Sequence, residues 1–202
     1  MFTGVWAWIV VCIVSYLLGA FSGSIFSSKT LFQKDVRDYG SSNAGLTNAI
    51  RNFGWKAGVI TCVIDVLKTL AALFFATWMV GHYGIIASGI LVCIGHAYPV
   101  YYKFKGGKCA VCSITILFFL SWKVALVIVA IFAIVLILTK KVSLGSMTGA
   151  IASPFAVWAF LPTDIYFILF AVVIALFVIF LHRSNIKRLV DGTENEVSKK
   201  TK

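Results

Sequence analysis

The chain has 202 residues, of which 60% are hydrophobic and 12% charged, and 18 Lys and Arg against 7 Asp and Glu give a formal net charge of +11. A soluble domain averages about 45–50% apolar residues and roughly a quarter charged ones, so this composition excludes an ordinary soluble enzyme and predicts an all-α integral membrane protein. The basic excess does not indicate nucleic-acid binding, because no soluble module presents it, and cationic loops on the cytoplasmic side of a membrane explain it better.

About seven apolar segments are predicted to be transmembrane helices, since a helix needs about 20 residues to cross a hydrocarbon core of ~30 Å. In chain order they are approximately 4–27, 55–80, 82–100, 108–121, 123–139, 144–161 and 164–182. The segment 108–121 is short for a span, which leaves tilting, re-entry or burial against neighbours open. We expect residues 1–191 to form a single polytopic membrane domain and residues 192–202 a polar cytoplasmic tail.

The distribution of Lys and Arg predicts the orientation. If the N-terminus lies outside, every Lys and Arg except Lys68 and Lys123 falls in an inner loop or in the C-terminal tail. Cytoplasmic loops of membrane proteins carry this excess of cations. We therefore expect an outside N-terminus, a cytoplasmic C-terminus and three basic patches, described next, on the cytoplasmic face.

The first patch covers residues 40–51 and combines small residues with side-chain hydrogen-bond donors. A short helix here would place Thr47 and Arg51 one turn apart on one face. Arginine presents a planar fork of donors that suits phosphate, although a capped turn with a positive-inside arginine is the structural alternative. The candidate residues of this patch are Ser41, Asn43, Thr47, Asn48 and Arg51.

The second patch, Lys103–Lys108, ends in two glycines and a lysine directly before an apolar segment. Free N–H groups at a helix N-terminus attract anions, and glycines let a phosphate approach the backbone. The patch is not a Walker A loop, because Tyr102 and Cys109 stand where that motif needs Gly and Ser or Thr. Its candidate residues are Lys105, Gly106, Gly107, Lys108 and Cys109.

The third patch joins Ser143–Ser146 to the stretch His182–Glu194. His182 and Asn185 lie three residues apart and so share a helical face. A basic anchor for anionic lipid is the alternative interpretation of this stretch. Within the second apolar segment, Asp65 and Lys68 are also three apart, and we interpret them as a structural ion pair.

Several kinds of chemistry lack support in the sequence. No His, Cys or carboxylate cluster has the spacing of a metal site, and no residue pattern indicates a cofactor. The spacing Cys109-x-x-Cys112 matches a redox motif but lacks the strand–helix context of a thioredoxin. No histidine is followed by Asp five residues later, which removes the His-x4-Asp arrangement of the acyl-CoA-dependent glycerolipid acyltransferases.

At these patches the chain resembles the bacterial acyl-phosphate:glycerol-3-phosphate acyltransferase family, PlsY. The family stretch D-(I/V)-R-x-x-G-S-G-N-x-G-A-T-N-x-x-R corresponds to Asp35–Arg51, and G-H-x-(F/Y)-P-V-(F/Y)-x-x-F-K-G-G-K corresponds to Gly95–Lys108. The elements V-S-L-G-S and H-R-x-N-I-x-R-L-x-x-G-T-E correspond to Val142–Ser146 and His182–Glu194. Four motifs in the family order are far more specific than any one. The chain departs from the family pattern at Ser42, Leu46, Thr69, Cys109 and Cys112.

The resemblance implies transfer of a fatty acyl group from acyl phosphate to the 1-hydroxyl of sn-glycerol 3-phosphate. The products would be lysophosphatidic acid and phosphate, the first step of phospholipid synthesis. It also implies a multi-pass protein of the bacterial cytoplasmic membrane that works without a cofactor, functions as a monomer and has its active site on the cytoplasmic face.

The resemblance implies roles for the candidate residues of all three patches. The catalytic set would be Ser41, Arg51, Lys108, His182 and Asn185. The substrate-phosphate-binding set would be Asn43, Thr47, Asn48, Lys105, Gly106, Gly107, Cys109 and Ser143. Asp65, Lys68 and Glu194 would be structural, with Glu194 fastening the tail. Two alternatives stay open: a small transporter of an anionic metabolite, and a catalytically degenerate member of the family.

Overall fold

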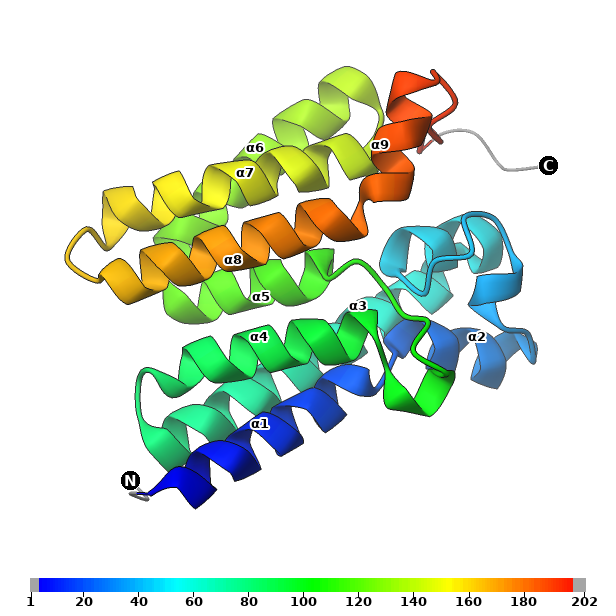
Figure 1. Cartoon of the computed structure of the whole chain (residues 1–202). Helices are drawn as coiled ribbons and strands as arrows, with labels where there is room; N and C mark the ends of the chain where they lie inside the picture. Colours follow the sequence, from blue (N-terminus) through cyan, green and yellow to red (C-terminus); the bar gives the residue numbers. More distant parts are fainter. Residues whose placement is uncertain (1–3, 198–202) are drawn as a thin grey trace. The chain divides into compact units, whose positions relative to one another are not determined.

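The computed structural model describes residues 4–197, and its regular elements in that range are all helical (Figure 1). In chain order they are α1 (Val5–Ala20), α2 (Gly23–Phe32), the single-turn helix η1 (Val36–Asp38), α3 (Leu46–Val80), α4 (Gly84–Ala97), the single-turn helix η2 (Val100–Tyr102), α5 (Ala110–Leu120), α6 (Trp122–Thr139), α7 (Val142–Phe160), α8 (Ile165–Leu181) and α9 (Arg183–Val190). The chain divides into two compact units, one ending at Phe119 and the other beginning at Leu120. Each unit is described by itself.

The first unit is built on α1, α3 and α4. Helices α1 and α4 run in the same direction, because Ser15 donates a hydrogen bond to Ser88 over 2.9 Å and Gly19, one turn later, contacts Val92. Their backbones approach closely where Gly95 of α4 faces α1. A Cβ at Gly95 would lie 2.8 Å from the amide nitrogen of Ala20 and closer still to the carbonyl oxygen of Tyr16. Small residues at such crossings let membrane helices pack backbone against backbone.

The second unit contains α6, α7 and α8, which are joined by short turns. Helices α6 and α7 run in opposite directions, since Gly145 packs on Phe132 and Gly149, one turn later, packs on Ile128. At the end of α8 the chain bends by 58° into α9. The bend places His182 at the junction and starts a short basic helix.

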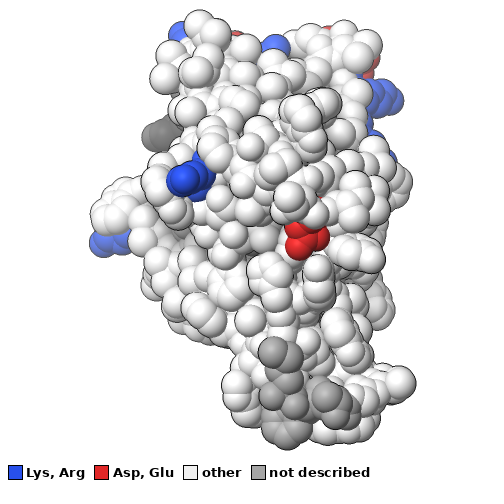
Figure 2. All heavy atoms as spheres, turned by 90° about the vertical axis from the view of Figure 1, so that its left-hand side faces the viewer, with Lys and Arg blue, Asp and Glu red and all other residues white. Residues whose placement is uncertain are grey.

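The exposed surface of the helices fits a lipid environment. Within residues 4–197, five helical stretches are long and apolar enough to cross a membrane, the first being α1 and α2 taken together (Val5–Phe32), or six if α8 and α9 count as one bent span. All six tryptophans are exposed, which is typical of side chains at the membrane–water boundary. Seen from the left-hand side of Figure 1, the surface consists mostly of uncharged side chains (Figure 2).

The all-helical membrane fold predicted from the sequence is confirmed, and several boundaries differ. Segment 55–80 is the main part of α3, whose helix is interrupted at Gly54 with φ 81°. The segment 4–27 is not one helix, because the chain breaks after Ala20 and continues as α2. Segment 108–121 contains only the 11 residues of α5, too few to cross a bilayer alone.

The count of seven spans, the single domain and the outside N-terminus stay predictions. Part of the predicted tail lies outside the described residues, namely 198–202 with Lys199, Lys200 and Lys202.

The contact between α1 and α4 provides a test of the first unit. We expect Gly95→Ala to lower the free energy of unfolding by about 1–3 kcal/mol, because the new methyl group meets backbone atoms that cannot rotate away. Gly149→Ala is the matched control, since its Cβ would meet a side-chain methyl of Ile128 (Cγ2) at 3.2 Å and the nearest backbone atom only at 3.8 Å. Thermal unfolding in detergent measures both, and a Gly95→Ala protein as stable as wild type would contradict the packing.

Candidate active site

The first patch is a loop that folds around the side chain of Asn48. This side chain is buried near the start of α3. Its Nδ2 group lies 3.0 Å from the carbonyl oxygens of Val36 and Tyr39 and 3.1 Å from that of Asn43. Its Oδ1 atom accepts hydrogen bonds from the backbone N–H of Ser41 at 3.1 Å and from Asn52 at 2.9 Å. One amide therefore determines the path of residues 36–43.

Arg37 joins the first patch to the second. Its guanidinium donates to both carboxylate oxygens of Asp35, at 2.9 and 2.8 Å, and to the carbonyl oxygens of Tyr102 at 2.7 Å and Lys105 at 3.3 Å. The hydrogen bond from Arg37 outweighs burial and lowers the pKa of Asp35 to about 2. Lys29 adds a second ion pair to the same carboxylate at 3.3 Å.

The second patch lies against the end of α4. The N–H groups of Gly106 and Gly107 donate to the carbonyl oxygens of Ala97 at 3.1 Å and His96 at 3.0 Å, which lack partners within their own helix. The carbonyl oxygen of Gly106 accepts a hydrogen bond from the N–H of Ala44 over 3.3 Å, so the first two patches are in direct contact.

The glycines of this loop are required by packing. A Cβ at Gly107 would collide with the imidazole ring of His96 and would lie 2.6 Å from the carbonyl oxygen of Ala44. Since both glycine amides already bond to α4, their direct contact with phosphate stays a prediction. The amides at the start of α5 and the side chain of Lys108 are the donors that the loop presents next.

Cys109 completes the loop with its thiol turned into the protein. The side chain is fully buried, its Sγ lies 3.1 Å from the carbonyl oxygen of Cys93, and its φ is 63°. A left-handed backbone here ends the loop and starts α5 at Ala110. A contact between Cys109 and phosphate would therefore involve its backbone.

Asp65 and Lys68 form the buried ion pair expected from the sequence. The ammonium of Lys68 lies 2.8 Å from Asp65 Oδ1, and the two side chains are only 4% and 2% exposed. Lys68 also donates to the carbonyl oxygens of Gly19 and Phe21, at 3.0 and 2.7 Å. The pair thus satisfies backbone groups at the break between α1 and α2.

The third patch is organised by Glu194 within the second unit. Its Oε1 atom accepts hydrogen bonds from Ser143 Oγ and Asn185 Nδ2, both at 2.6 Å, and its Oε2 atom pairs with Arg188 at 2.7 Å. Burial alone would raise the pKa of Glu194, but these three donors outweigh it and lower the pKa below the ordinary value. Glu194 has the contacts expected of a residue that fastens the tail.

His182 lies at the bend between α8 and α9 and is buried. Its Nδ1 atom lies 2.8 Å from the carbonyl oxygen of Val178. Because a carbonyl can only accept, Nδ1 carries the proton and, in the neutral ring, Nε2 is an acceptor. Asn185 follows in the first turn of α9, so the two side chains share one end of this helix.

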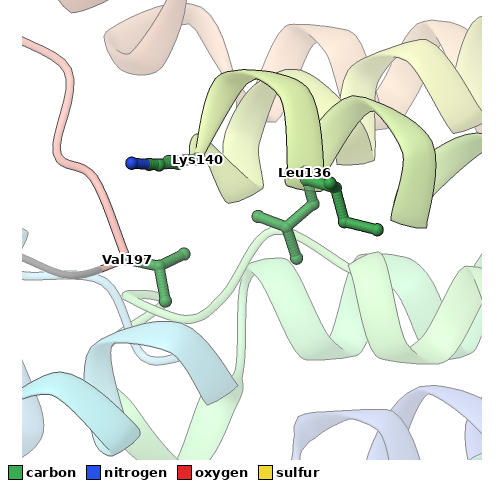
Figure 3. Close-up of a pocket in the computed structure, with 4 residues that line it drawn as sticks. Leu136, Lys140 and Val197 are labelled. Atoms are coloured by element: carbon green, nitrogen blue, oxygen red, sulfur yellow. The ribbon is translucent and has the colours of Figure 1, made fainter.

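A small apolar hollow of about 290 Å³ lies beside the tail in the same unit. It is lined by Leu136, Ile137, Lys140 and Val197. Figure 3 shows Leu136 of α6 and Val197 of the tail on two sides of it. The N–H of Val197 donates to the carbonyl oxygen of Lys140 at 3.0 Å, so the tail is attached here as well as at Glu194.

The predicted residues thus fall into two sets. The first unit holds Ser41, Asn43, Thr47, Asn48, Arg51, Lys105, Gly106, Gly107, Lys108 and Cys109, and the second holds Ser143, His182, Asn185 and Glu194. That both sets meet in one pocket stays a prediction. Sequence reasoning missed Arg37 as the bridge between patches, although its place in the first motif was a usable signal.

Comparisons with known proteins agree on one family. A sequence model described as glycerol-3-phosphate acyltransferase matches residues 9–192. The glycerol-3-phosphate acyltransferase of Finegoldia magna is 40% identical over 191 residues, covering 95% of this chain and 96% of that protein. The protein of the same name from Bacillus subtilis is 37% identical over 186 residues, covering 92% and 95%.

Two crystal structures of PlsY (YgiH), described as an integral membrane glycerol 3-phosphate acyltransferase, have the same fold. The glycerol 3-phosphate form gives a TM-score of 0.85 and the lysophosphatidic acid form 0.83. Each is 30% identical in sequence and covers 94% of both chains.

The hydrogen bonds of Asn48 generate one prediction. Asn48→Ala and Asn48→Asp both remove the amide NH2 group that three backbone carbonyls share, so each is expected to lower the free energy of unfolding by about 1–3 kcal/mol. Asn52→Ala, at the edge of the same network, should cost less. Unchanged thermal unfolding with a raised substrate KM would instead assign Asn48 to direct phosphate binding.

Glu194 generates a second prediction, in which pH is the variable. Its folded pKa lies below the ordinary value, so its contribution to stability is present above that value and is lost as pH falls through the folded pKa. The protection of residues 183–197 against hydrogen exchange, measured relative to the intrinsic rate at each pH, should therefore fall as the pH drops below the ordinary Glu pKa and through the lower folded value. Glu194→Gln should exchange rapidly already at neutral pH, and Asp191→Asn should behave as wild type. Protection of these residues that does not change with pH in wild type would refute the fastening role.

Proposed function

The chain belongs to the PlsY-type glycerol-3-phosphate acyltransferase family, and from this premise we propose the reaction and the roles of its residues. The protein is a membrane enzyme that acylates glycerol 3-phosphate to lysophosphatidic acid. The observation that carries this conclusion is a match over 94% of the chain to a PlsY structure determined in a glycerol 3-phosphate form.

We propose acyl phosphate as the donor. The 1-hydroxyl oxygen of glycerol 3-phosphate attacks the acyl carbonyl carbon, and the bond from that carbon to the phosphate oxygen breaks. Acyl phosphate is a mixed anhydride, so phosphate leaves readily without strong acid catalysis. The hydroxyl proton passes to a phosphate oxygen, since no side chain among the candidates stands out as a general base.

Binding two anions side by side is the main task of such a site. Arg51 and Lys108 bring positive charge to the two contacting patches of the first unit, where Ser41 and Thr47 add hydroxyl donors. Holding the hydroxyl against the carbonyl carbon is worth about 7–11 kcal/mol when the reactants are well oriented. The cations also stabilise the charge that develops on the leaving phosphate.

The second unit supplies His182, Asn185 and Ser143 to the same reaction. The acceptor Nε2 of His182 suits a substrate hydroxyl, because Nδ1 is already used by Val178. Glu194 holds Ser143 and Asn185 in place through short hydrogen bonds. In this proposal Glu194 positions the two residues and does not react.

The location of the reaction follows from the charge pattern. The patches with the Lys and Arg residues belong on the cytoplasmic side of the bacterial inner membrane. Both substrates present phosphate groups there, while the acyl chain remains among the helices or in the lipid. The protein acts as a monomer and without a cofactor in this proposal.

Replacement of the two cations tests the proposal. Purified protein in detergent, given palmitoyl phosphate and glycerol 3-phosphate, should release phosphate and lysolipid. Lys108→Ala and Arg51→Ala should each reduce kcat/KM by about 10²–10³-fold, because each removes charge stabilisation at the reacting phosphates. Lys123→Ala, an exposed cation at the start of α6, is the control and should retain wild-type turnover.

The same assay separates the alternatives. Palmitoyl-CoA in place of palmitoyl phosphate should give no product if acyl phosphate is the donor. A transporter would need a sealed compartment and would show no turnover in detergent, as would a degenerate family member. Full activity in both cation variants would remove the proposed phosphate sites while leaving the acyltransferase assignment intact.

A further inference from the structure

We propose that Asp65, Lys68 and His96 form a positioning unit that sets the place of the Lys105–Lys108 loop for substrate phosphate. The inference deepens the proposed function, on which it rests, and concerns residues that the reaction itself does not use. None of the three is placed in contact with substrate. They act through the backbone of Gly106 and Gly107.

Lys68 is the centre of this unit and is buried in the middle of a helix. Its ammonium has three protons and lies within hydrogen-bond distance of four acceptors. These are Gly19 O at 3.0 Å, Phe21 O at 2.7 Å, Asp65 Oδ1 at 2.8 Å and His96 Nδ1 at 2.9 Å. Because the ammonium can only donate, Nδ1 of His96 is an acceptor, and the proton of its neutral ring is on Nε2. The ring orientation is therefore fixed by a buried charge.

His96 transmits this orientation to the loop by two contacts. Its carbonyl oxygen accepts the N–H of Gly107 over 3.0 Å, and its Nε2 atom packs against the α-carbon side of the same glycine. The neighbouring Ala97 accepts the N–H of Gly106 over 3.1 Å. If the ring had another orientation, it would no longer form the surface against which Gly107 packs. Because Lys108 follows directly after Gly107, its position would change as well.

Asp65 and α2 connect the same centre to the first patch. The backbone N–H of Gly23, at the start of α2, lies 3.4 Å from Asp65 Oδ1. Later in α2 the hydroxyl of Ser28 accepts the N–H of Val36 over 3.1 Å, at the beginning of the loop that Asn48 holds. The buried ion pair is thus linked to the Lys105–Lys108 loop through His96 and to the first patch through α2.

The free-energy cost of burying Asp65 and Lys68 in an apolar segment supports a role for them beyond stability. Charged residues inside an apolar membrane segment are expensive, and well-packed apolar replacements of buried ion pairs often stabilise a protein. Elsewhere in the first compact unit of the chain, a purely structural contact between helices uses uncharged groups, as in the Ser15–Ser88 hydrogen bond. A charged centre that fixes an imidazole beside the glycine loop supplies orientation, which an apolar contact does not.

The test replaces His96 and measures both substrates. His96→Leu keeps apolar volume, and Lys68 still has three acceptors for its three protons, so the protein should fold. We expect the KM of at least one phosphate substrate to rise about 10–100-fold with kcat changed far less, because a misplaced binding loop weakens the binding of substrate and transition state alike, and each tenfold is about 1.4 kcal/mol. His96→Asn, whose Oδ1 occupies the place of Nδ1, should recover part of the loss.

Ser88→Ala is the matched control, because it breaks a buried hydrogen bond of the same helix two turns before His96. It should lower the unfolding temperature without changing either KM. The inference is overturned if His96→Leu has wild-type KM for both substrates, or if Ser88→Ala raises KM equally at a similar loss of stability. If His96→Leu does not fold, His96→Met, which also lacks the imidazole, is judged by the same criterion, and His96→Asn stays the rescue variant.

Absence of turnover in wild type would refute the proposed function instead. Turnover in wild type that Lys108→Ala abolishes, together with an unaffected His96→Leu, would refute this inference alone.

Discussion

The ion pair between Asp65 and Lys68, at the break between α1 and α2, is the interaction on which the first unit depends. A helix that stops inside an apolar stretch leaves carbonyl and amide groups without partners, and each costs several kcal/mol in lipid. Lys68 donates hydrogen bonds to two of these carbonyls, and the carboxylate of Asp65 accepts one from the N–H of Gly23. The break becomes stable, and α2 is free to pack with the start of α3, where Ile25, Val36 and Ala49 share a core.

Both loops of the first unit are shaped before any substrate arrives. The side chains of Asn48 and Arg37 donate hydrogen bonds to backbone carbonyls of these loops, and the N–H groups of Gly106 and Gly107 cap the end of α4. Preorganised donors and charges are worth more in a site that excludes water, because they need no rearrangement during the reaction. In the proposed reaction, these preformed loops contribute together with the cations.

The sequence predicted the helical class, the main part of α3 and the Asp65–Lys68 pair, because apolar length and an isolated charge pair leave strong signals. It did not predict the break after Ala20, because apolar residues lie on both sides of it and no proline is present; the stretch Ser22–Ser24, whose Ser22 caps α2, was the usable signal. The hydrogen-bond partners of Asn48 and of the Gly107 N–H group could not be predicted from the sequence either. They depend on loops whose path is set by contacts from distant parts of the chain.

These partners change how the motif residues are to be understood. A sequence motif contains two kinds of residue: those that contact the substrate, and those that hold the contacting residues in place. Loss of either kind abolishes activity. Asn48 and Glu194 have their polar atoms occupied by neighbouring loop and side-chain groups, which is the mark of the second kind. Arg51 and Lys108 are the residues that we propose supply the positive charge for the phosphates of the two substrates. For Asn48 and Glu194 this follows from counting donors against acceptors, because a side chain whose hydrogen bonds are already made has few left to offer a ligand.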